Sequence, residues 1–160
     1  MEWFVRAFVK ASVAWLAAGV TLGVGMAARP AWAVYRPAHV HMVALGFVAM
    51  MIYGVAYHVV PRFSGHPLHG RRAAGWHWSA ANAGLALVVA GFALRAVGSP
   101  AGTPVLAAGG VLSALGAYAF AYVIWRTVDG PAARRAVGSS THRSRRAPLP
   151  QAAVVGPGAA

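Results

Sequence analysis

The sequence predicts an all-α integral membrane protein built as a four-helix bundle. Two observations carry this prediction: 59% of the 160 residues are hydrophobic, and only two residues are acidic, Glu2 and Asp129. A third observation is the length of the uncharged runs, which reach the roughly 20 residues that a helix needs to cross the hydrocarbon layer of a bilayer. The lipid bilayer is therefore the first partner that the sequence indicates.

The first two predicted helices contain the most specific patterns. The first covers residues 9–28 and carries Gly19 and Gly23, a small-xxx-small spacing that allows two helix backbones to approach closely. A cleaved signal peptide is the alternative for this region, because an A-x-A pattern follows the apolar run at residues 31–33. The second helix is expected over residues 37–60 and contains no Asp, Glu, Lys or Arg.

The rest of the chain divides into two further helices and a tail. Helices are expected over residues 75–95 and 105–125, joined by a turn rich in glycine and proline. We therefore expect residues 1–126 to form one transmembrane domain. Residues 127–160 are rich in arginine, proline and glycine and lack apolar periodicity, which predicts a basic, disordered tail.

The basic residues predict how the helices are oriented. In a four-helix arrangement one end of the bundle has only Arg29, Arg36 and Arg95, whereas the other basic residues lie at the opposite end or in the tail. The positive-inside rule then places both termini in the cytoplasm, with the chain in the plasma (inner) membrane of a bacterium. The net charge of +12 does not indicate nucleic acid as a partner, because the arginines occur at helix ends and in the tail.

Histidines mark the second helix as a candidate cofactor site. His39 and His41 lie at its start, and His58 lies near its end. An ionisable side chain inside a membrane span costs free energy and so suggests a function, and imidazole is a common ligand of haem iron and of copper. On an ideal helix His39 and His41 point about 200° apart, so they share one site only if the first turn is frayed or Pro37 tilts it. We expect at least one of them to be a ligand. The alternative is that both are interfacial residues without a ligand.

Further residues are candidates for the same chemistry. Met26 can supply a second, thioether ligand beside His39 or His41, and Tyr57 is a candidate cofactor contact. His58 and His77 form a second candidate pair, because they lie at the same membrane level on adjacent helices and bundles hold haem between facing helices. The absence of cysteine excludes thiolate ligation and covalent haem attachment.

Six residues between positions 37 and 80 follow one another at fixed spacings: His41, Gly54, Tyr57, Pro61, Pro67 and His77. In this stretch the chain resembles subunit I of the cbb3-type haem–copper oxidases. The resemblance implies that His41, near the outer face, is a retained haem or metal ligand. The next helix has Leu85, Gly91 and Phe92 where that family has a tyrosine and a His-His pair for copper. Oxygen reduction by this chain alone is therefore not expected.

These observations predict a membrane b-type haem protein that transfers electrons or binds a small gas such as NO or O2. A haem b held between two copies, in a homo-oligomer, would explain why each chain has a single ligand helix. The alternative is a non-enzymatic accessory subunit of a respiratory complex that binds copper or no cofactor. A structural membrane protein with interfacial histidines is the third interpretation.

Overall fold

The computed structural model describes residues 2–130, and within this range all regular secondary structure is helical. Three of the long helices are α1 (Trp3–Ala28), α4 (Arg71–Ala96) and α5 (Gly102–Asp129). Together with a composite segment, Pro30–Ser64, they give four helices that are long and apolar enough to cross a membrane. The predicted fold class, an all-α membrane bundle of four helices, is confirmed.

The second span is one continuous segment made of four helical elements of three kinds. It consists of the 3-10 helix η1 (Pro30–Tyr35), the α-helix α2 (Arg36–His41), the π-helix η2 (Met42–Ala49) and the α-helix α3 (Met50–Ser64). At the end of η2 the Met50 amide donates to the Leu45 carbonyl, five residues back, which is the π-helical pattern. π-Helical turns are frequent at functional sites, and His39 and His41 directly precede η2.

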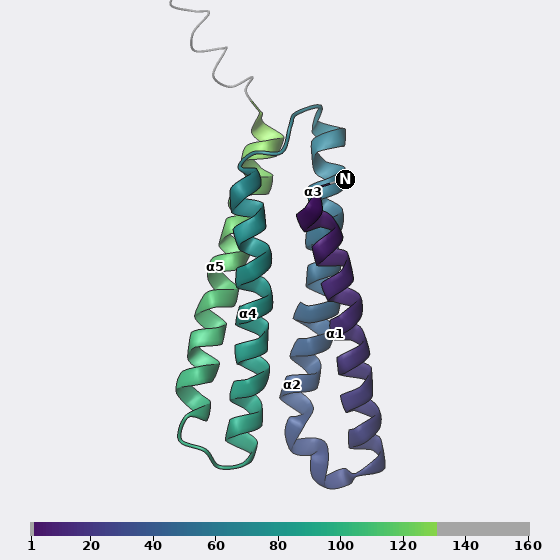
Figure 1. Cartoon of the computed structure of the whole chain (residues 1–160), viewed down its shortest axis with the longest axis vertical. Coiled ribbons are helices and arrows are strands. Elements are labelled where there is room, and N and C mark those ends of the chain that lie inside the picture. Colours follow the sequence, from purple (N-terminus) through teal and green to yellow (C-terminus); the bar gives the residue numbers. More distant parts are fainter. Residues whose placement is uncertain (1, 131–160) are drawn as a thin grey trace, which may run out of the picture. The chain divides into compact units, whose positions relative to one another are not determined.

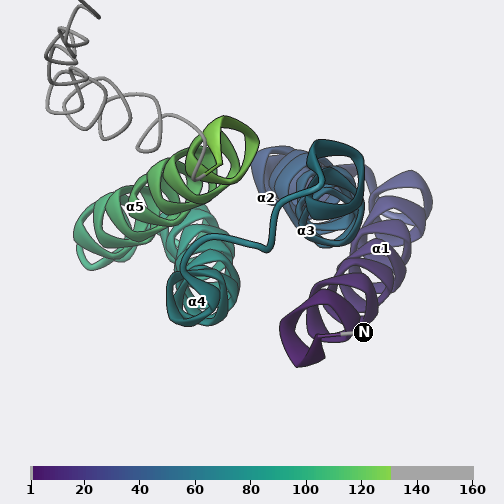
Figure 2. The same ribbon diagram turned by 90° about the horizontal axis from the view of Figure 1, so that it is seen from above.

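The four spans form two antiparallel hairpins, α1 with α2–η2–α3 and α4 with α5 (Figures 1 and 2). Within the first hairpin α1 packs on η2 and α3, and the hairpins meet where α2 contacts α4 and α3 contacts α5. The connection from α3 to α4 begins and ends with glycines in the left-handed region, Gly65 at φ 68° and Gly70 at φ 65°. A side chain at either position would be strained.

The α4–α5 hairpin is held by direct backbone contact along a seam of glycines. A Cβ atom at Gly91 would lie 2.6 Å from the Leu106 amide nitrogen, and one at Gly109 would lie 2.6 Å from the Val88 amide nitrogen. The seam glycines recur every seven residues on each helix: Gly84 and Gly91 on α4, and Gly102, Gly109 and Gly116 on α5. Close packing of small residues replaces the hydrophobic effect as the force between membrane helices.

The first helix begins earlier than predicted, at Trp3 instead of residue 9. Phe4 and Phe8 are fully buried, and their rings lie 5.6 and 6.0 Å from the ring of Tyr57. Phe4 and Phe8, which precede the predicted start of the helix, are therefore part of the core. They belong to the helix because they pack on α3.

The other helix ends also extend beyond the predicted limits. α3 continues through Pro61 to Ser64, and α4 begins at Arg71. Pro61 lies in the last turn, where the missing amide removes only one hydrogen bond, and membrane helices tolerate this loss. α5 extends to Asp129, so residues 127–129 are helical and not part of the predicted tail. Residues 131–160 of that tail lie outside the described residues.

Thr127 shows why α5 continues. Its hydroxyl donates to the Val123 carbonyl at 2.7 Å and accepts the His69 amide at 3.0 Å, which joins α5 to the α3–α4 connection. The side chain of Thr127 is 1% exposed. The last turn of α5 is thus held by tertiary contacts that the composition of the region does not reveal.

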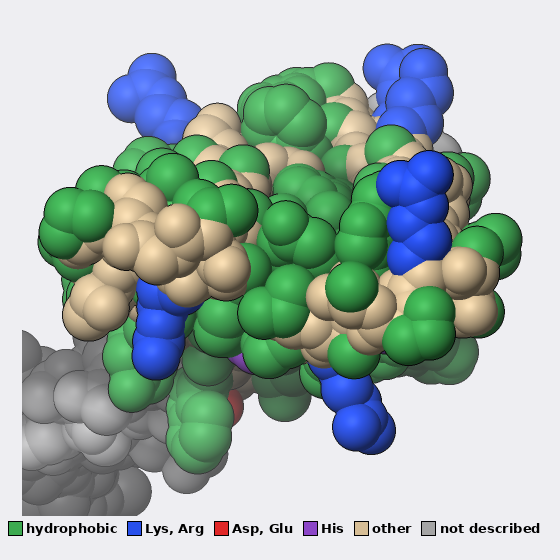
Figure 3. All heavy atoms as spheres, turned by 90° about the horizontal axis from the view of Figure 1, so that it is seen from below, with side chains coloured by type: hydrophobic (Ala, Val, Ile, Leu, Met, Phe, Trp, Pro, Cys, Tyr) green, Lys and Arg blue, Asp and Glu red, His purple; other side chains and the backbone are tan. Residues whose placement is uncertain are grey.

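The two ends of the bundle differ in charge as predicted. Figure 3 views the end formed by η1 and the α4–α5 turn, where basic side chains project from the edge of a largely hydrophobic surface. Arg29, Arg36 and Arg95 flank this end, and all three are exposed. At the opposite end Arg71 forms an ion pair with Glu2. The structure shows how the basic residues are distributed between the two ends of the bundle. The orientation of the bundle in a membrane stays a prediction.

The orientation is tested with reporters. A reporter that is active only on the outer side of the membrane, fused after Ala160, is expected to be silent. The same reporter inserted after Ser99, in the α4–α5 turn, is expected to be active, because the helix hairpin places that turn on the other side. The reverse pattern would invert the topology and move His41 to the cytoplasmic face.

Candidate functional site

His39 lies between α2 and α1. Its Nδ1–H donates to the Gly19 carbonyl at 2.8 Å, and a Cβ at Gly23 would lie 3.0 Å from its Cε1. The Gly19–Gly23 spacing therefore makes room for this imidazole. Because a carbonyl can only accept, the hydrogen is on Nδ1 and the lone pair of the neutral ring is on Nε2. Metal-binding histidines are commonly fixed in this tautomer by such a bond.

His41 is fixed in the same tautomer but faces another helix. Its Nδ1–H donates to the Pro37 carbonyl at 2.8 Å, and its ring lies 5.1 Å from that of Phe92 on α4. The two side chains thus point in different directions, as helical geometry predicted: His39 packs against α1 and His41 against α4. The two imidazoles belong to separate environments within one copy of the chain.

Met26 lies where the sequence analysis placed it, beside His39. Both residues line a cavity of about 480 Å³ at the η1 end of the bundle, together with Arg36 and Val40. A thioether and an imidazole with a free Nε2 are a ligand combination suited to Cu(I) or to haem iron. His41 does not line this cavity.

His77 has the most buried imidazole among the described residues, at 0% exposure. Three aromatic rings surround it, with centroids 4.9 Å away for Phe8, 4.6 Å for Tyr53 and 5.7 Å for Phe120. The Tyr57 hydroxyl and His77 Nδ1 share a hydrogen bond of 2.9 Å, and His77 Nε2 has no partner. This side chain is therefore enclosed by its neighbours, and one of its two ring nitrogens is buried without a partner.

The position of His77 follows from the glycine seam. It precedes Gly84 by seven residues on α4, and across the seam a Cβ at Gly116 would lie 3.1 Å from its Cδ2. Glycine at position 116 thus makes room for the imidazole. The sequence predicted His77 as a candidate ligand paired with His58 and did not predict its burial, although the seven-residue spacing of His77, Gly84 and Gly91 was a signal that could have placed it on the seam.

Tyr57 and His58 lie at the end of the bundle opposite His39 and His41. Tyr57 bonds to His77, whereas His58 lines a different cavity with Pro61 and Arg71, to which His77 does not contribute. The structure therefore does not bring His58 and His77 into one cavity. Tyr57 is positioned to orient His77 and not to contact a group bound at His41.

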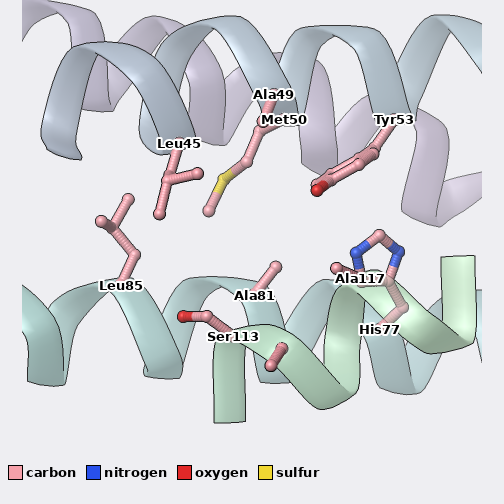
Figure 4. A pocket seen from close by; sticks show the side chains of 10 residues that line it. Leu45, Ala49, Met50, Tyr53, His77, Ala81, Leu85, Ser113 and Ala117 are labelled. Atoms are coloured by element: carbon pink, nitrogen blue, oxygen red, sulfur yellow. The ribbon is translucent and has the colours of Figure 1, made fainter. Parts of the chain in front are cut away.

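A third cavity, of about 240 Å³, lies beside His77 between the two hairpins (Figure 4). Leu45, Met50 and Tyr53 approach it from η2 and α3, while His77, Ala81 and Leu85 approach from α4, and Ser113 and Ala117 from α5. Sequence reasoning did not find this cavity, because its lining comes from positions that are far apart in the chain.

Within residues 2–130 no group of three or more His, Cys, Asp or Glu side chains lies close enough together to hold a metal ion. A metal or haem would therefore rely on one histidine per chain, with methionine, an exogenous ligand or a second copy completing the coordination. No protein-family model, characterised protein or solved structure matches this chain. The resemblance to cbb3-type subunit I accordingly stays a prediction.

Proposed function

We propose that the chain is an integral membrane b-type haem protein, related to subunit I of cbb3-type oxidases, that transfers electrons or binds NO or O2. The observation that supports this proposal is the tautomer of His41 and His39. Each donates Nδ1–H to a backbone carbonyl, and each thereby keeps an Nε2 lone pair for iron. Both residues lie at the arginine-poor end of the bundle, which the positive-inside rule assigns to the outer face of a bacterial plasma membrane.

The surroundings of His41 fit a porphyrin that lies on the outside of the bundle. Below His41 the helix exposes Leu45, Val48 and Ile52, an apolar face long enough to contact a macrocycle. Phe92 provides an aromatic edge beside the imidazole. Because these side chains are exposed, a second copy of the chain would cover the other side of the porphyrin, so the proposal includes a homo-oligomer. Haem would supply the redox or gas-binding chemistry. An open sixth position on the iron would favour gas binding, and a filled one would favour electron transfer.

The test is the haem content of purified variants. Wild-type protein from haem-sufficient cells should show a Soret band, and His41→Ala should reduce it to background while the protein still inserts. His58→Ala is the matched control, since it removes a histidine from the same helical segment outside the proposed site, and it should keep the spectrum. A colourless wild type, or a normal Soret band in both His41→Ala and His39→Ala, would contradict haem ligation by this helix.

A copper-binding accessory subunit of a respiratory complex is the second candidate. The observation that favours it is the cavity shared by His39 and Met26. In the same experiment this candidate predicts a colourless protein that retains Cu(I), with the copper lost in Met26→Leu.

A further inference from the structure

Another cavity, of about 620 Å³, lies between the start of α1 and the first turns of α4, which Figure 1 shows at the same end of the bundle. It is lined by Glu2 and Trp3 from the start of α1, and by Arg71, Arg72, Trp76 and Ser79 from α4. Trp3, Arg72, Trp76 and Ser79 are exposed residues. A ligand can therefore reach these groups from outside the bundle.

The indole of Trp3 forms the α1 wall of this cavity and is held against α4. A Cβ at Gly75 would lie 2.9 Å from Trp3 Cζ2, so glycine at this position makes room for the ring. The same ring packs edge-on against that of Trp78, with centroids 6.1 Å apart. Trp3 and Trp76 stay 54% and 49% exposed, and tryptophan prefers the level of the lipid headgroups. The cavity therefore lies at the boundary between the bilayer core and water.

The lining of this cavity carries a net positive charge. Glu2 is the only acidic residue that lines it, and Glu2 forms an ion pair with Arg71. Within residues 2–130 Arg72 forms no ion pair. Two guanidinium groups therefore face one carboxylate, and an anion with a single charge would balance the excess. A phosphodiester has that charge, and its oxygens match the donor geometry of arginine.

The positions of the lining groups along α4 match the layers of a phospholipid. Arg72 lies in the first turn of α4, where a membrane-spanning helix reaches the headgroups. Ser79 follows Arg72 by seven residues, which is about 10 Å of helix towards the bilayer core. The hydroxyl of Ser79 thus lies deeper than the arginines, at the level of the ester groups of a lipid. A free phosphate ion has no group that reaches this depth while it contacts the arginines.

We propose that this cavity binds the headgroup of an anionic phospholipid, with the phosphate at Arg71 and Arg72 and an ester oxygen at Ser79. The indoles of Trp3 and Trp76 flank the glycerol, and the acyl chains continue along the apolar outer surface of the bundle. A headgroup with an ammonium group binds less tightly, because it brings a second positive charge close to Arg72. The site lies at the opposite end of the bundle from His39 and His41, so the proposal holds for a haem-free protein.

Native mass spectrometry of the purified full-length chain in detergent counts the bound lipids. The chain is titrated with phosphatidylglycerol and, for comparison, with phosphatidylethanolamine that carries the same acyl chains. One phosphatidylglycerol per chain should bind about fivefold more tightly, the effect of about one charge at a membrane surface. Inorganic phosphate in large excess should not displace it, because the ion cannot contact Ser79 and the indoles as well.

Variants separate this cavity from the general attraction of a basic surface for anions. Arg72→Gln removes the guanidinium that has no ion pair and should weaken phosphatidylglycerol binding about fivefold. Arg6→Gln is the matched control, because Arg6 is also exposed at this end of the bundle but does not line the cavity, and it should bind like wild type. Ser79→Ala removes the deeper hydrogen bond and should weaken binding about two- to fivefold. All three positions are exposed, so the variants should fold.

Three results would overturn the proposal. The first is equal affinity for phosphatidylglycerol and phosphatidylethanolamine. The second is an equal loss of affinity in Arg6→Gln and Arg72→Gln, which would show attraction to the basic end of the bundle as a whole. The third is displacement of the lipid by inorganic phosphate, which would make the cavity a site for the free ion.

Discussion

Gly109→Val is expected to lower the stability of the bundle by about 1–3 kcal/mol, the usual cost of forcing extra atoms into a packed interior. A Cβ at this position would lie 2.6 Å from the Val88 amide nitrogen and 2.8 Å from the Gly84 carbonyl oxygen. These neighbours are backbone atoms of α4, which cannot move aside as a side chain can. The two helices must separate, and the contacts along the whole seam weaken with them.

The adjacent glycine provides the control for this variant. Gly110 is exposed, and a Cβ built on it meets no atom within 4 Å. Gly110→Val introduces the same side chain into the same helix and should change stability little. The measurement is the midpoint of thermal or SDS-induced unfolding in detergent. Equal midpoints for the two variants would show that backbone contact at Gly109 does not hold the hairpin.

Tyr57→Phe is expected to destabilise the protein by about 1–3 kcal/mol, the cost of leaving a buried polar group without its partner. The phenol oxygen is the partner of His77 Nδ1 at 2.9 Å, and Nε2 of the same ring has no partner in the chain. Removing the hydroxyl therefore leaves both nitrogens of a fully buried imidazole unbonded. The lost group is small, so the effect reports on the hydrogen bond and not on packing.

A double-mutant cycle separates this hydrogen bond from other effects. His77→Leu alone leaves the Tyr57 hydroxyl unpaired, but the double variant removes both polar groups and should cost less than the sum of the single changes. Tyr53→Phe is the matched control, because Tyr53 contacts the same imidazole through its ring at 4.6 Å. Additive single changes, or an equal loss in Tyr53→Phe, would contradict the pairing.

The fold class was predictable because span length and the near absence of acidic residues are properties of the composition. Helix ends were harder to predict, since they depend on tertiary contacts. α1 begins at Trp3 because Phe4 and Phe8 pack on Tyr57, and α5 continues past Trp125 because Thr127 bonds to the α3–α4 connection. Neither contact has a local signal in the sequence.

The candidate site was predictable in part. His39 and His41 were identified because histidine is rare in an apolar helix. The level of His39, His41 and Met26 in the membrane follows from their distance, in residues, to the nearest helix end. The burial of His77 was missed because it depends on Gly116, 39 positions later in the chain, and on aromatic rings from three other helices. The π-helical turns of η2 have no signal in the sequence that we can identify.

The seven-residue repeat of the glycine seam has a consequence for how α4 and α5 find their alignment. If one helix slid past the other by seven residues, glycines would again lie opposite the backbone of the partner helix. The glycine seam alone therefore lets the two helices approach closely but does not determine which residues lie opposite one another. Such a slide would pull apart the turn at residues 97–101, where the Ser99 amide donates to the Leu94 carbonyl and the Gly102 amide donates to the Ser99 carbonyl. The hydrogen-bonded turn therefore favours the observed alignment over one shifted by seven residues, and the observed alignment sets Gly116 against the ring of His77.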